Sequence, residues 1–399
     1  MRILLLSWNF PPVRGGIEYV VENLFAGLRR RGHQIAVVTT SAEGDEKDPD
    51  VHRAPAAALK RYVRYSITKG FALCRSMRPD AILCGTLVGA PAGYVLSRLF
   101  GKPYIVLVHG SDILRPGCIY HRVARFLLRR ATRIVANSTQ TGRLLPNLGV
   151  NERKVEVIHP GVRVGDFVSG VGAASAAVGT RPRTTAAEAA PTAASPRRVL
   201  LSVGRLIRRK GLLEFVEHAM PALVRRYPNV LLLIVGEDAK ASLVHPERMR
   251  EKIEAKVREL RLEEHVKLLG GVPQAELVEL FRRAELFVLP VLDVPADVEG
   301  FGIVAIEAAM AGVPTVGTRV GGVPEAVDDG KTGLLVEPGD HDAMIGAIAR
   351  LLDDETLRRS LGQAAESRAR TQFAWDVIIE QYERMMASAI AASADRPRR

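Results

Sequence analysis

The sequence predicts two α/β domains, each built on a doubly wound parallel sheet, that face each other across a cleft. Along its 399 residues, short apolar runs that end in turn residues alternate with helical patterns, as in parallel sheets covered by helices. The chain is also too long for one ordinary hydrophobic core and has the length of two domains. Each half opens with the same kind of strand, RILLLSW at residues 2–8 and RVLLSVG at residues 198–204.

The strands are continuous apolar runs, which is typical of strands buried on both faces of a parallel sheet. In the first half we predict strands at residues 2–8, 34–40, 81–85, 104–110 and 133–137, and helices at residues 17–31, 90–100 and 119–130. In the second half we predict strands at residues 198–204, 230–236, 266–271, 286–291 and 314–318, and helices at residues 211–226, 246–260, 274–283 and 302–311.

Residues 165–197 separate the halves and are predicted to form a linker or a mobile insertion. They are rich in Ala, Gly, Ser, Thr and Pro and show no periodic apolar spacing. Such a segment buries too little apolar surface to offset the entropy that ordering would cost. We therefore place one domain at residues 1–164, a second at residues 198–372 and a terminal segment at residues 373–399.

The composition is that of a globular protein, with 47% hydrophobic and 25% charged residues. No apolar run approaches the roughly 18 residues of a membrane-spanning helix. The apolar run before Ser7 is only four residues long, too short for a signal peptide. The three cysteines lack metal-ligand spacing, so we expect reduced thiols in a cytoplasmic protein.

Positive charge is concentrated in the first half. Residues 1–160 hold 24 basic and 11 acidic side chains, whereas acidic side chains are in excess over residues 199–399. Residues 53–78 contain seven basic residues and no acidic one, interleaved with apolar residues, and residues 118–133 add five arginines. We interpret both segments as a surface for anionic lipid; the alternative is ordinary solvated helices. No nucleic-acid-binding motif accompanies the charge, so a nucleic-acid partner is not expected.

Ligands of open parallel sheets bind beyond the carboxyl ends of the strands, so residues that follow strands are candidates for a site. After the first strand, Gly15 and Gly16 precede a helix and allow an anion to approach its free amides. Their spacing is not GxGxxG, which argues against a nicotinamide cofactor. His109 and Asp112 follow the strand at 104–110, where a histidine can hydrogen-bond a sugar hydroxyl. An ordinary turn and a structural histidine are the alternatives.

Arg205 and Lys210 follow the strand at residues 198–204 and precede the next helix. Two cations in one turn can neutralise a diphosphate, because arginine offers a planar fork and lysine a point charge. Basic loops often contribute only to solubility. Their place directly after Gly204, at the end of a strand, favours a phosphate site.

The segment EGFGIVAIEAAMAG at residues 299–312 places Glu299 just before a helix and Glu307 on its second turn. The first amides of that helix can bind phosphate, and the carboxylates can accept hydrogen bonds from sugar and ribose hydroxyls. Paired carboxylates are also found in glycosidases, but adjacent cations and helix amides suit a sugar diphosphate better than a neutral polysaccharide. The remaining alternative is a helix cap and a solvated glutamate.

The stretch EGFGIVAIEAAMAGVPTVGTRVGGVPEAVDDG resembles the donor site of the retaining glycosyltransferases of family four. GRLIRRKG, HGSD, the Gly15-Gly16 turn and VIHPGV match that family in the same order, so the resemblance covers nearly the whole chain. It implies the GT-B fold, in which two Rossmann-like domains face a cleft. It also implies transfer of a sugar from a nucleotide-diphosphate donor with retained anomeric configuration.

The resemblance assigns a role to each matching residue. Arg205 and Lys210 would hold the diphosphate and stabilise the leaving group, and Gly16 would give the phosphate access. Glu299 would contact the transferred sugar, Glu307 the ribose hydroxyls, and His109 would lie at the reacting centre. The sugar and phosphates would also meet the backbone of Gly300, Phe301, Gly302, Ile303 and Val304, and the base would lie against Leu269, Gly271 and Val272. The resemblance implies neither a metal nor a cofactor.

The terminal pattern FAWDVIIEQYERMM at residues 373–386 resembles the helix that crosses back onto the first domain in this fold, with Trp375 as an anchor. A surface helix of the second domain is the alternative. The Ala-rich linker is longer than the compact connection of the family.

Three classes of function stay open from the sequence. The first is a glycosyltransferase that uses a nucleotide sugar and a glycan or lipid-linked acceptor, at the inner face of the cytoplasmic membrane. The second is a sugar-nucleotide epimerase or hydrolase on the same scaffold, and the third is a non-catalytic nucleotide-sugar binder. Arg205, Lys210, Glu299 and Glu307 together favour catalysis. The sequence does not identify the sugar, the nucleotide or the acceptor.

Overall fold

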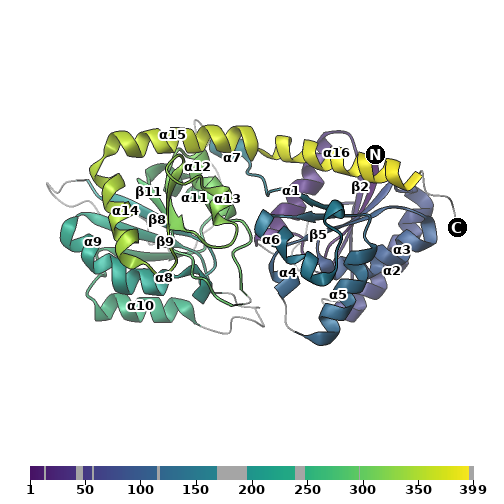
Figure 1. Cartoon of the computed structure of the whole chain (residues 1–399), viewed down its shortest axis with the longest axis horizontal. Coiled ribbons are helices and arrows are strands. Elements are labelled where there is room, and N and C mark those ends of the chain that lie inside the picture. The colour runs from purple at the N-terminus through teal and green to yellow at the C-terminus, as the bar shows by residue number, and fades with distance from the viewer. Residues whose placement is uncertain are drawn as a thin grey trace.

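The computed structural model describes residues 1–12, 15–41, 48–55, 58–114, 117–168, 196–238, 248–295 and 297–394. It contains two α/β domains that lie side by side (Figure 1). All strand pairs within both sheets are parallel. The predicted fold class is confirmed.

The N-terminal sheet has seven strands in the order β3-β2-β1-β4-β5-β6-β7. Its strands are β1 Arg2–Leu6, β2 Gln34–Thr39, β3 Val51–Arg53, β4 Ala81–Cys84, β5 Tyr104–Val108, β6 Arg133–Ala136 and β7 Val155–Val157. Its main helices are α1 Gly16–Arg30, α2 Leu59–Met77, α3 Ala90–Phe100, α4 Ser111–Leu114, α5 Cys118–Arg130 and α6 Thr139–Leu144. The central strands are buried on both faces, as their unbroken apolar sequences predict.

The C-terminal sheet has six strands in the order β10-β9-β8-β11-β12-β13. The strands are β8 Arg198–Val203, β9 Val230–Val235, β10 Val266–Gly270, β11 Leu286–Leu289, β12 Thr315–Thr318 and β13 Gly333–Val336. The helices are α7 Val164–Val168, α8 Leu212–Glu214, α9 Met220–Arg226, α10 Met249–Glu259, α11 Gln274–Arg283, α12 Ile303–Met310, α13 Val323–Ala326, α14 His341–Asp353 and α15 Glu355–Gln372.

The helix predicted at residues 211–226 is divided in the structure. A π turn at Phe215–Ala219 joins α8 to α9. Pro221 follows it in the first turn of α9 and has no amide hydrogen, so the regular α-helical bonding is interrupted there.

The first residues of the predicted linker are helical and belong to the C-terminal domain. Phe167 in α7 is buried in that domain's core, with its ring 6.2 Å from the ring of Phe281. The predicted linker therefore begins too early in the sequence. Most of it, residues 169–195, lies outside the described part of the chain.

The last helix, α16 Trp375–Ala394, leaves the C-terminal domain and runs over the N-terminal domain (Figure 1). Its buried face joins the apolar core that includes α1, and Ile379 lies over Gly27, where an added Cβ would come within 2.6 Å of it. Glu383 also pairs with His33, with Oε1 2.6 Å from Nε2. Helix α16 is therefore a structural part of the N-terminal domain.

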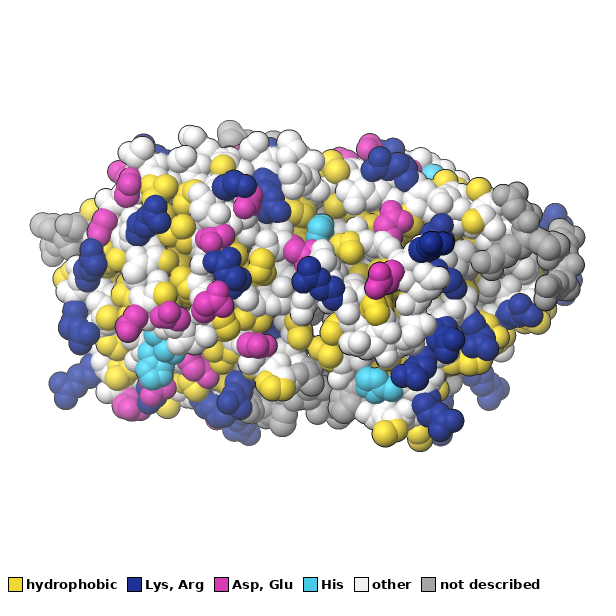
Figure 2. Space-filling model, in the orientation of Figure 1, with side chains coloured by type: hydrophobic (Ala, Val, Ile, Leu, Met, Phe, Trp, Pro, Cys, Tyr) yellow, Lys and Arg dark blue, Asp and Glu magenta, His cyan; other side chains and the backbone are white. Residues whose placement is uncertain are grey.

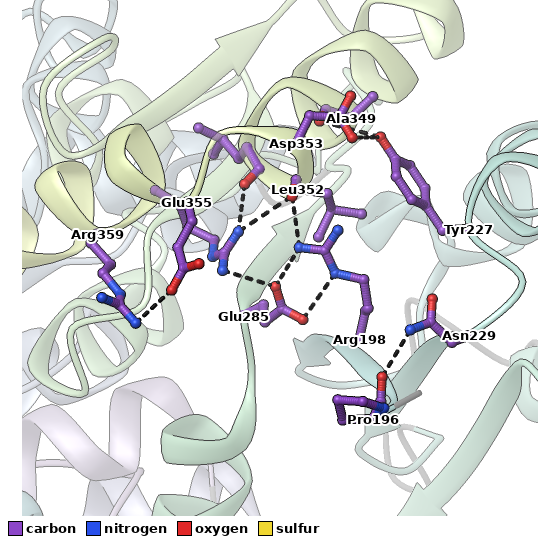
Figure 3. Close-up of polar contacts among 12 residues, drawn as sticks. Pro196, Arg198, Tyr227, Asn229, Glu285, Ala349, Leu352, Asp353, Glu355 and Arg359 are labelled. Carbon is purple, nitrogen blue, oxygen red and sulfur yellow. Dashed lines mark hydrogen bonds and ion pairs between the residues drawn. The ribbon is translucent and has the colours of Figure 1, made fainter. Parts of the chain in front are cut away.

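A polar network ties the C-terminal sheet to its covering helices at the edge where strands begin. Arg198 at the start of β8 forms two hydrogen bonds with Glu285, just before β11, and donates a third to the carbonyl of Leu352 in α14 (Figure 3). Because ligands of parallel sheets bind beyond the opposite ends of the strands, we interpret this network as structural.

Candidate functional site

A cluster of cations and carboxylates lies where β8 and β11, neighbours in the C-terminal sheet, both end. Lys210, from the turn after β8, places Nζ 2.8 Å from Oε2 of Glu299, from the loop after β11. Arg209 contacts the same carboxylate oxygen and donates from Nε to Oδ1 of Asp297 at 3.0 Å. The sheet therefore brings together two residues predicted from separate motifs, Lys210 and Glu299.

Glycines allow the turn after β8 to fold onto this cluster. Gly204 has φ 151°, and an added Cβ there would lie 3.2 Å from Cε of Lys210, so the lysine side chain passes over its backbone. Gly211 has φ 66°, and an added Cβ would lie 1.9 Å from the carbonyl oxygen of Pro290. A larger residue at 211 would push the turn away from the loop after β11.

Burial and the neighbouring charges act in opposite directions on the pKa values of this cluster. Burial by itself raises the pKa of Glu299, but Lys210 and Arg209 outweigh it and lower that pKa to about 2. Burial lowers the pKa of Lys210, and Glu299 opposes that change. Arg205 is exposed at the rim of the cluster and also helps to lower the pKa of Glu299. The site therefore offers an exposed arginine beside an ionised buried carboxylate.

The segment before α12 faces the N-terminal domain. An added Cβ at Gly300 would lie 2.8 Å from Nδ2 of Asn137, which follows β6. Gly16 at the start of α1 lies opposite Ile303, with 3.9 Å between its would-be Cβ and Cδ1 of Ile303. The first amides of α12, including those of Ile303 and Val304, therefore lie close to the domain interface. Gly302 precedes them with φ 86°, a conformation that favours glycine.

Phe301 is buried between the two parts of the chain that form the interface. Its ring stacks on His159, with centroids 4.9 Å apart, and also contacts Phe373. Phe301 as a whole is 2% exposed, so its ring is part of the packed interface between the domains.

Glu307, on the second turn of α12, has an environment unlike that of Glu299. Burial raises its pKa to about 7, the charge of Asp166 adds to the rise, and Arg163 opposes it. Burial raises the pKa of Tyr19 of α1, and the charge of Glu307 adds to that rise. Glu307 of α12 therefore lies near α1, which contains Tyr19, and near the segment that contains Arg163 and Asp166.

His109 follows β5 and is 7% exposed. Its Nε2 lies 3.0 Å from the carbonyl oxygen of Gly85, which can only accept a hydrogen bond, so this nitrogen carries the proton. Asp112 lies one turn further in α4, and its carbonyl accepts a bond from the hydroxyl of Tyr120 at 2.7 Å. The loops after β4 and β5 are thus fixed to each other beside the predicted reacting centre.

Gly15, which precedes α1, is partly covered by a side chain. A Cβ added to Gly15 would lie 2.4 Å from Oε2 of Glu18, whose Oε1 accepts a hydrogen bond from Asn9 at 2.6 Å. A carboxylate therefore occupies the space at the start of α1 where we predicted a phosphate to approach. That side chain has to turn away before an anion reaches Gly15.

The predicted base-binding wall lies at the end of β10. Leu269 is 37% exposed, and the pairing of β10 with β9 shifts between Leu268 and Gly270. A Cβ added to Gly271 would lie 3.3 Å from Oε1 of Glu237. Val272 packs on the core of the C-terminal domain.

Sequence reasoning missed four residues that connect the site: Arg209, Asp297, Asn137 and Glu325. Glu325 in α13 bridges the domains, because it accepts hydrogen bonds from the amide of Thr139 at 2.7 Å and pairs with Nε2 of His159 at 2.9 Å. Asn137 and Glu325 follow strands β6 and β12, so inspection of every strand end would have found both. An open cavity of about 630 Å³ adjoins this bridge and includes Arg143 and Asp293 in its lining.

Among the residues that the structure describes, no group of three or more His, Cys, Asp or Glu side chains is arranged to hold a metal ion. None of the helices built from them is both long enough and apolar enough to cross a membrane.

Comparison with known families accounts for both domains. The family described as "Glycosyl transferases group 1" matches residues 185–368, and "Glycosyltransferase Family 4" matches residues 14–165. The chain is 27% identical to the glycogen synthase of Mycobacterium tuberculosis, over 95% of this chain and 92% of the relative. It is 29% identical to the GDP-mannose-dependent alpha-(1-6)-phosphatidylinositol monomannoside mannosyltransferase of Mycolicibacterium smegmatis, over 94% of this chain and 95% of the relative.

Solved structures share the same fold. Sucrose-phosphate synthase from Thermosynechococcus elongatus superposes with a TM-score of 0.78 at 22% identity, covering 98% of this chain and 99% of that chain. HepE of Anabaena, solved with UDP-glucose, gives a TM-score of 0.72 at 20% identity, and the match covers 97% of this chain and 100% of HepE. Two facing parallel-sheet domains with a shared site between them define the GT-B glycosyltransferases. The chain belongs to this class and to its group 1, family 4 type.

Proposed function

We propose that this glycosyltransferase moves a sugar from a nucleotide diphosphate to its acceptor with retained anomeric configuration and without a bound metal. The observation that carries the proposal is the buried cluster of Arg209, Lys210 and Glu299, with Arg205 at its rim. A leaving diphosphate needs positive charge as its bond to the sugar breaks. Arg205, Lys210 and the first amides of α12 are the groups that would supply that charge.

The carboxylates have the complementary task of holding hydroxyl groups. Glu299 is ionised at neutral pH and can accept hydrogen bonds from the transferred sugar. Glu307, on the second turn of α12, would hold the ribose hydroxyls. The acceptor hydroxyl would approach from the N-terminal domain, near His109, and pass its proton to the departing phosphate on the same face of the sugar.

The activity test uses labelled UDP-, GDP- and ADP-sugars with a lipid extract and with soluble glycans. Formation of a new glycosidic bond supports the proposal, and the anomeric configuration of the product tests retention. An isomerised or hydrolysed donor would instead support an epimerase or hydrolase. Donor binding without any reaction would support a non-catalytic binder. Activity that persists in excess EDTA tests metal independence.

The donor panel is chosen from the relatives. One relative is named as GDP-mannose-dependent, and one similar structure contains UDP-glucose. Both nucleotides are therefore tested first, by the rise in melting temperature that each one causes. The nucleotide that stabilises the chain most identifies the donor class.

We further propose that the acceptor is lipid-linked and that the N-terminal domain rests on the inner face of the cytoplasmic membrane. Helix α5 exposes an apolar stripe, with Ile119 81%, Val123 47% and Phe126 42% exposed. These positions are four and three residues apart, so they share one face of the helix. Basic side chains gather over the part of this domain that contains α5 (Figure 2). Helix α5 itself contains Arg122, Arg125, Arg129 and Arg130, and all four are exposed.

Helix α2, within the other basic segment, supports the same surface less directly. Tyr62 and Cys74 are buried in the domain, so much of its apolar face belongs to the core. Leu59 and Phe71 are 53% and 41% exposed. We therefore assign membrane contact mainly to α5, where apolar insertion and attraction to anionic lipid coincide.

A further inference from the structure

One residue, Arg209, connects the turn after β8 to the loop after β11. Its backbone carbonyl accepts a hydrogen bond from the amide of Leu292 at 2.8 Å. Its guanidinium donates to Asp297 at 3.0 Å through Nε and contacts Glu299 through Nη1. The side chain is 9% exposed. Arg209 therefore connects both loops that form the proposed donor site.

The neighbouring cation, Lys210, shares one carboxylate oxygen with Arg209. Nζ of Lys210 lies 2.8 Å from Oε2 of Glu299, the oxygen that Arg209 also contacts. A nucleotide diphosphate carries more negative charge than one exposed arginine, Arg205, neutralises. When the donor binds, Lys210 can turn from the carboxylate to the phosphate, because its ammonium lies at the end of a flexible side chain.

This movement of Lys210 would leave the buried carboxylate of Glu299 without a positive partner if no other cation stayed in contact with it. Its side chain is only 12% exposed. A buried carboxylate that loses its partner is strongly destabilising, because its charge is left without compensation. The guanidinium of Arg209 is already bonded to both carboxylates, and its rigid planar fork fixes the two contacts relative to each other, which the rotatable donors of a lysine do not.

We propose that Arg209 is a positioning residue that keeps Glu299 and Asp297 in place while Lys210 moves to the donor diphosphate. This inference rests on the proposed function. Arg209 acts through Glu299 and needs no contact of its own with the donor. Its removal therefore affects the orientation of the sugar more than the affinity for the nucleotide.

The test compares Arg209→Gln and Arg209→Lys with Arg208→Gln. Arg208 is a matched control, because it is the preceding residue of the same turn and is exposed. We expect Arg209→Gln to lower kcat by about 100-fold, with a much smaller change in the affinity for UDP or GDP. Arg209→Lys should recover part of the loss, and Arg208→Gln should stay within about two-fold of the wild type.

Two readouts separate positioning from general damage. Loss of Arg209 lets the pKa of Glu299 rise, so kcat of Arg209→Gln should fall at acidic pH where that of the wild type stays flat. In a Glu299→Gln background, adding Arg209→Gln should lower kcat by less than about three-fold, because the residue acts through Glu299. If the two losses multiply instead, Arg209 acts on the donor directly and the positioning role is wrong.

Thermal unfolding checks that each variant is folded, and Arg209→Lys replaces Arg209→Gln in the double-variant comparison if the latter does not fold. A wild-type chain that transfers no sugar would contradict the proposed function. A wild type that transfers sugar, while Arg209→Gln and Arg209→Lys keep normal kcat, would contradict only the role given to Arg209.

Discussion

Glu299 and Glu307 are both carboxylates in a largely enclosed region, but their neighbours shift their pKa values in opposite directions. Lys210 and Arg209 overcome the effect of burial and lower the pKa of Glu299 to about 2. Burial and the charge of Asp166 raise the pKa of Glu307 to about 7. At neutral pH the first is ionised and the second titrates. The two glutamates of the motif therefore differ in how they respond to pH.

We predict that donor affinity rises with pH through the titration of Glu307. As a carboxylate, Glu307 can accept hydrogen bonds from both ribose hydroxyls, so binding of UDP or GDP should strengthen between about pH 6 and pH 8. Calorimetric titration across this range measures the effect. The Glu307→Gln variant should bind the nucleotide more weakly than the wild type at pH 8, and its affinity should no longer depend on pH. A wild-type Kd that does not change with pH would contradict the role assigned to Glu307.

The same raised pKa predicts how stability depends on pH. The folded chain keeps the proton of Glu307 up to about pH 7, whereas an unfolded glutamate loses it near its ordinary value of 4.5. The stabilisation is thus fully present below the unfolded pKa and is lost as pH rises toward 7. Denaturant titrations of the wild type and Glu307→Gln should therefore converge at low pH and diverge toward neutral pH.

We predict that Lys210→Ala and Glu299→Ala each fold and each lower transfer by a factor of about 100 or more. Lys210→Ala removes charge that stabilises the leaving group, and Glu299→Ala removes a contact to the sugar. Initial rates at saturating donor measure the loss, and circular dichroism checks the fold. Near-normal turnover in either variant would remove the role assigned to that residue.

The sequence placed Lys210 and Glu299 in the site but did not distinguish Arg209 from its neighbours. Arg208, Arg209 and Lys210 are three adjacent cations, and only the short helical turn that they form decides which side chains point inward. Arg208 is exposed, whereas Arg209 and Lys210 are buried. Composition and spacing carry no information about that choice, because it depends on the loop after β11.

Among the secondary-structure elements, α16 has the clearest energetic role. Ile379 of α16 is fully buried and lies against Gly27 of α1, where no room is left for a Cβ. We predict that Ile379→Ala lowers the free energy of unfolding by about 2–4 kcal/mol. The substitution leaves a cavity between α16 and α1 that the two helices cannot close by moving together. Urea denaturation measures the loss.

The neighbouring residue Glu380 provides the control for that experiment. It is exposed and pairs with Arg31 only at the surface, so Glu380→Ala should change stability by less than about 0.5 kcal/mol. Equal effects of the two substitutions would mean that α16 is held by surface charge, not by apolar packing.

The prediction of elements was most accurate where apolar runs were long. Strands of the sheet centres, such as β1 and β9, were found because they are buried on both faces. The strands β3, β7 and β13 were missed. The strands β3 and β7 are each three residues long and only half buried at a sheet edge, and β13 is a four-residue strand at the edge of the C-terminal sheet. Pairing with a neighbour, more than their own sequence, makes these segments strands.

At the scale of the whole molecule, the domains are joined by specific contacts as well as by the chain. Glu325 accepts hydrogen bonds from the first amides of α6, and the ring of His159 lies between Glu325 and Phe301. Burial opposes ionisation of Glu325, but hydrogen bonds from His159 and Thr139 outweigh it and lower its pKa to about 2. No pattern in one sequence predicts such a bridge, because its partners are separated by more than 150 residues.

We predict that the chain sediments with vesicles that contain anionic lipid and not with neutral vesicles. Arg125→Glu combined with Arg129→Glu should weaken this binding by more than about ten-fold, because each cation near the surface contributes roughly 1 kcal/mol. Lys267→Glu combined with Lys331→Glu makes the same change of charge in the other domain and should have little effect. Equal sedimentation with both kinds of vesicle would contradict the proposed membrane surface.

The position of α16 also has a consequence for biosynthesis. The nascent chain completes α1 early, but the helix that covers it consists of the 20 residues Trp375–Ala394. At ribosomal rates of about 5–20 residues per second, that surface stays open for tens of seconds. A premature stop codon that removes only this last helix would therefore harm the domain that is translated first.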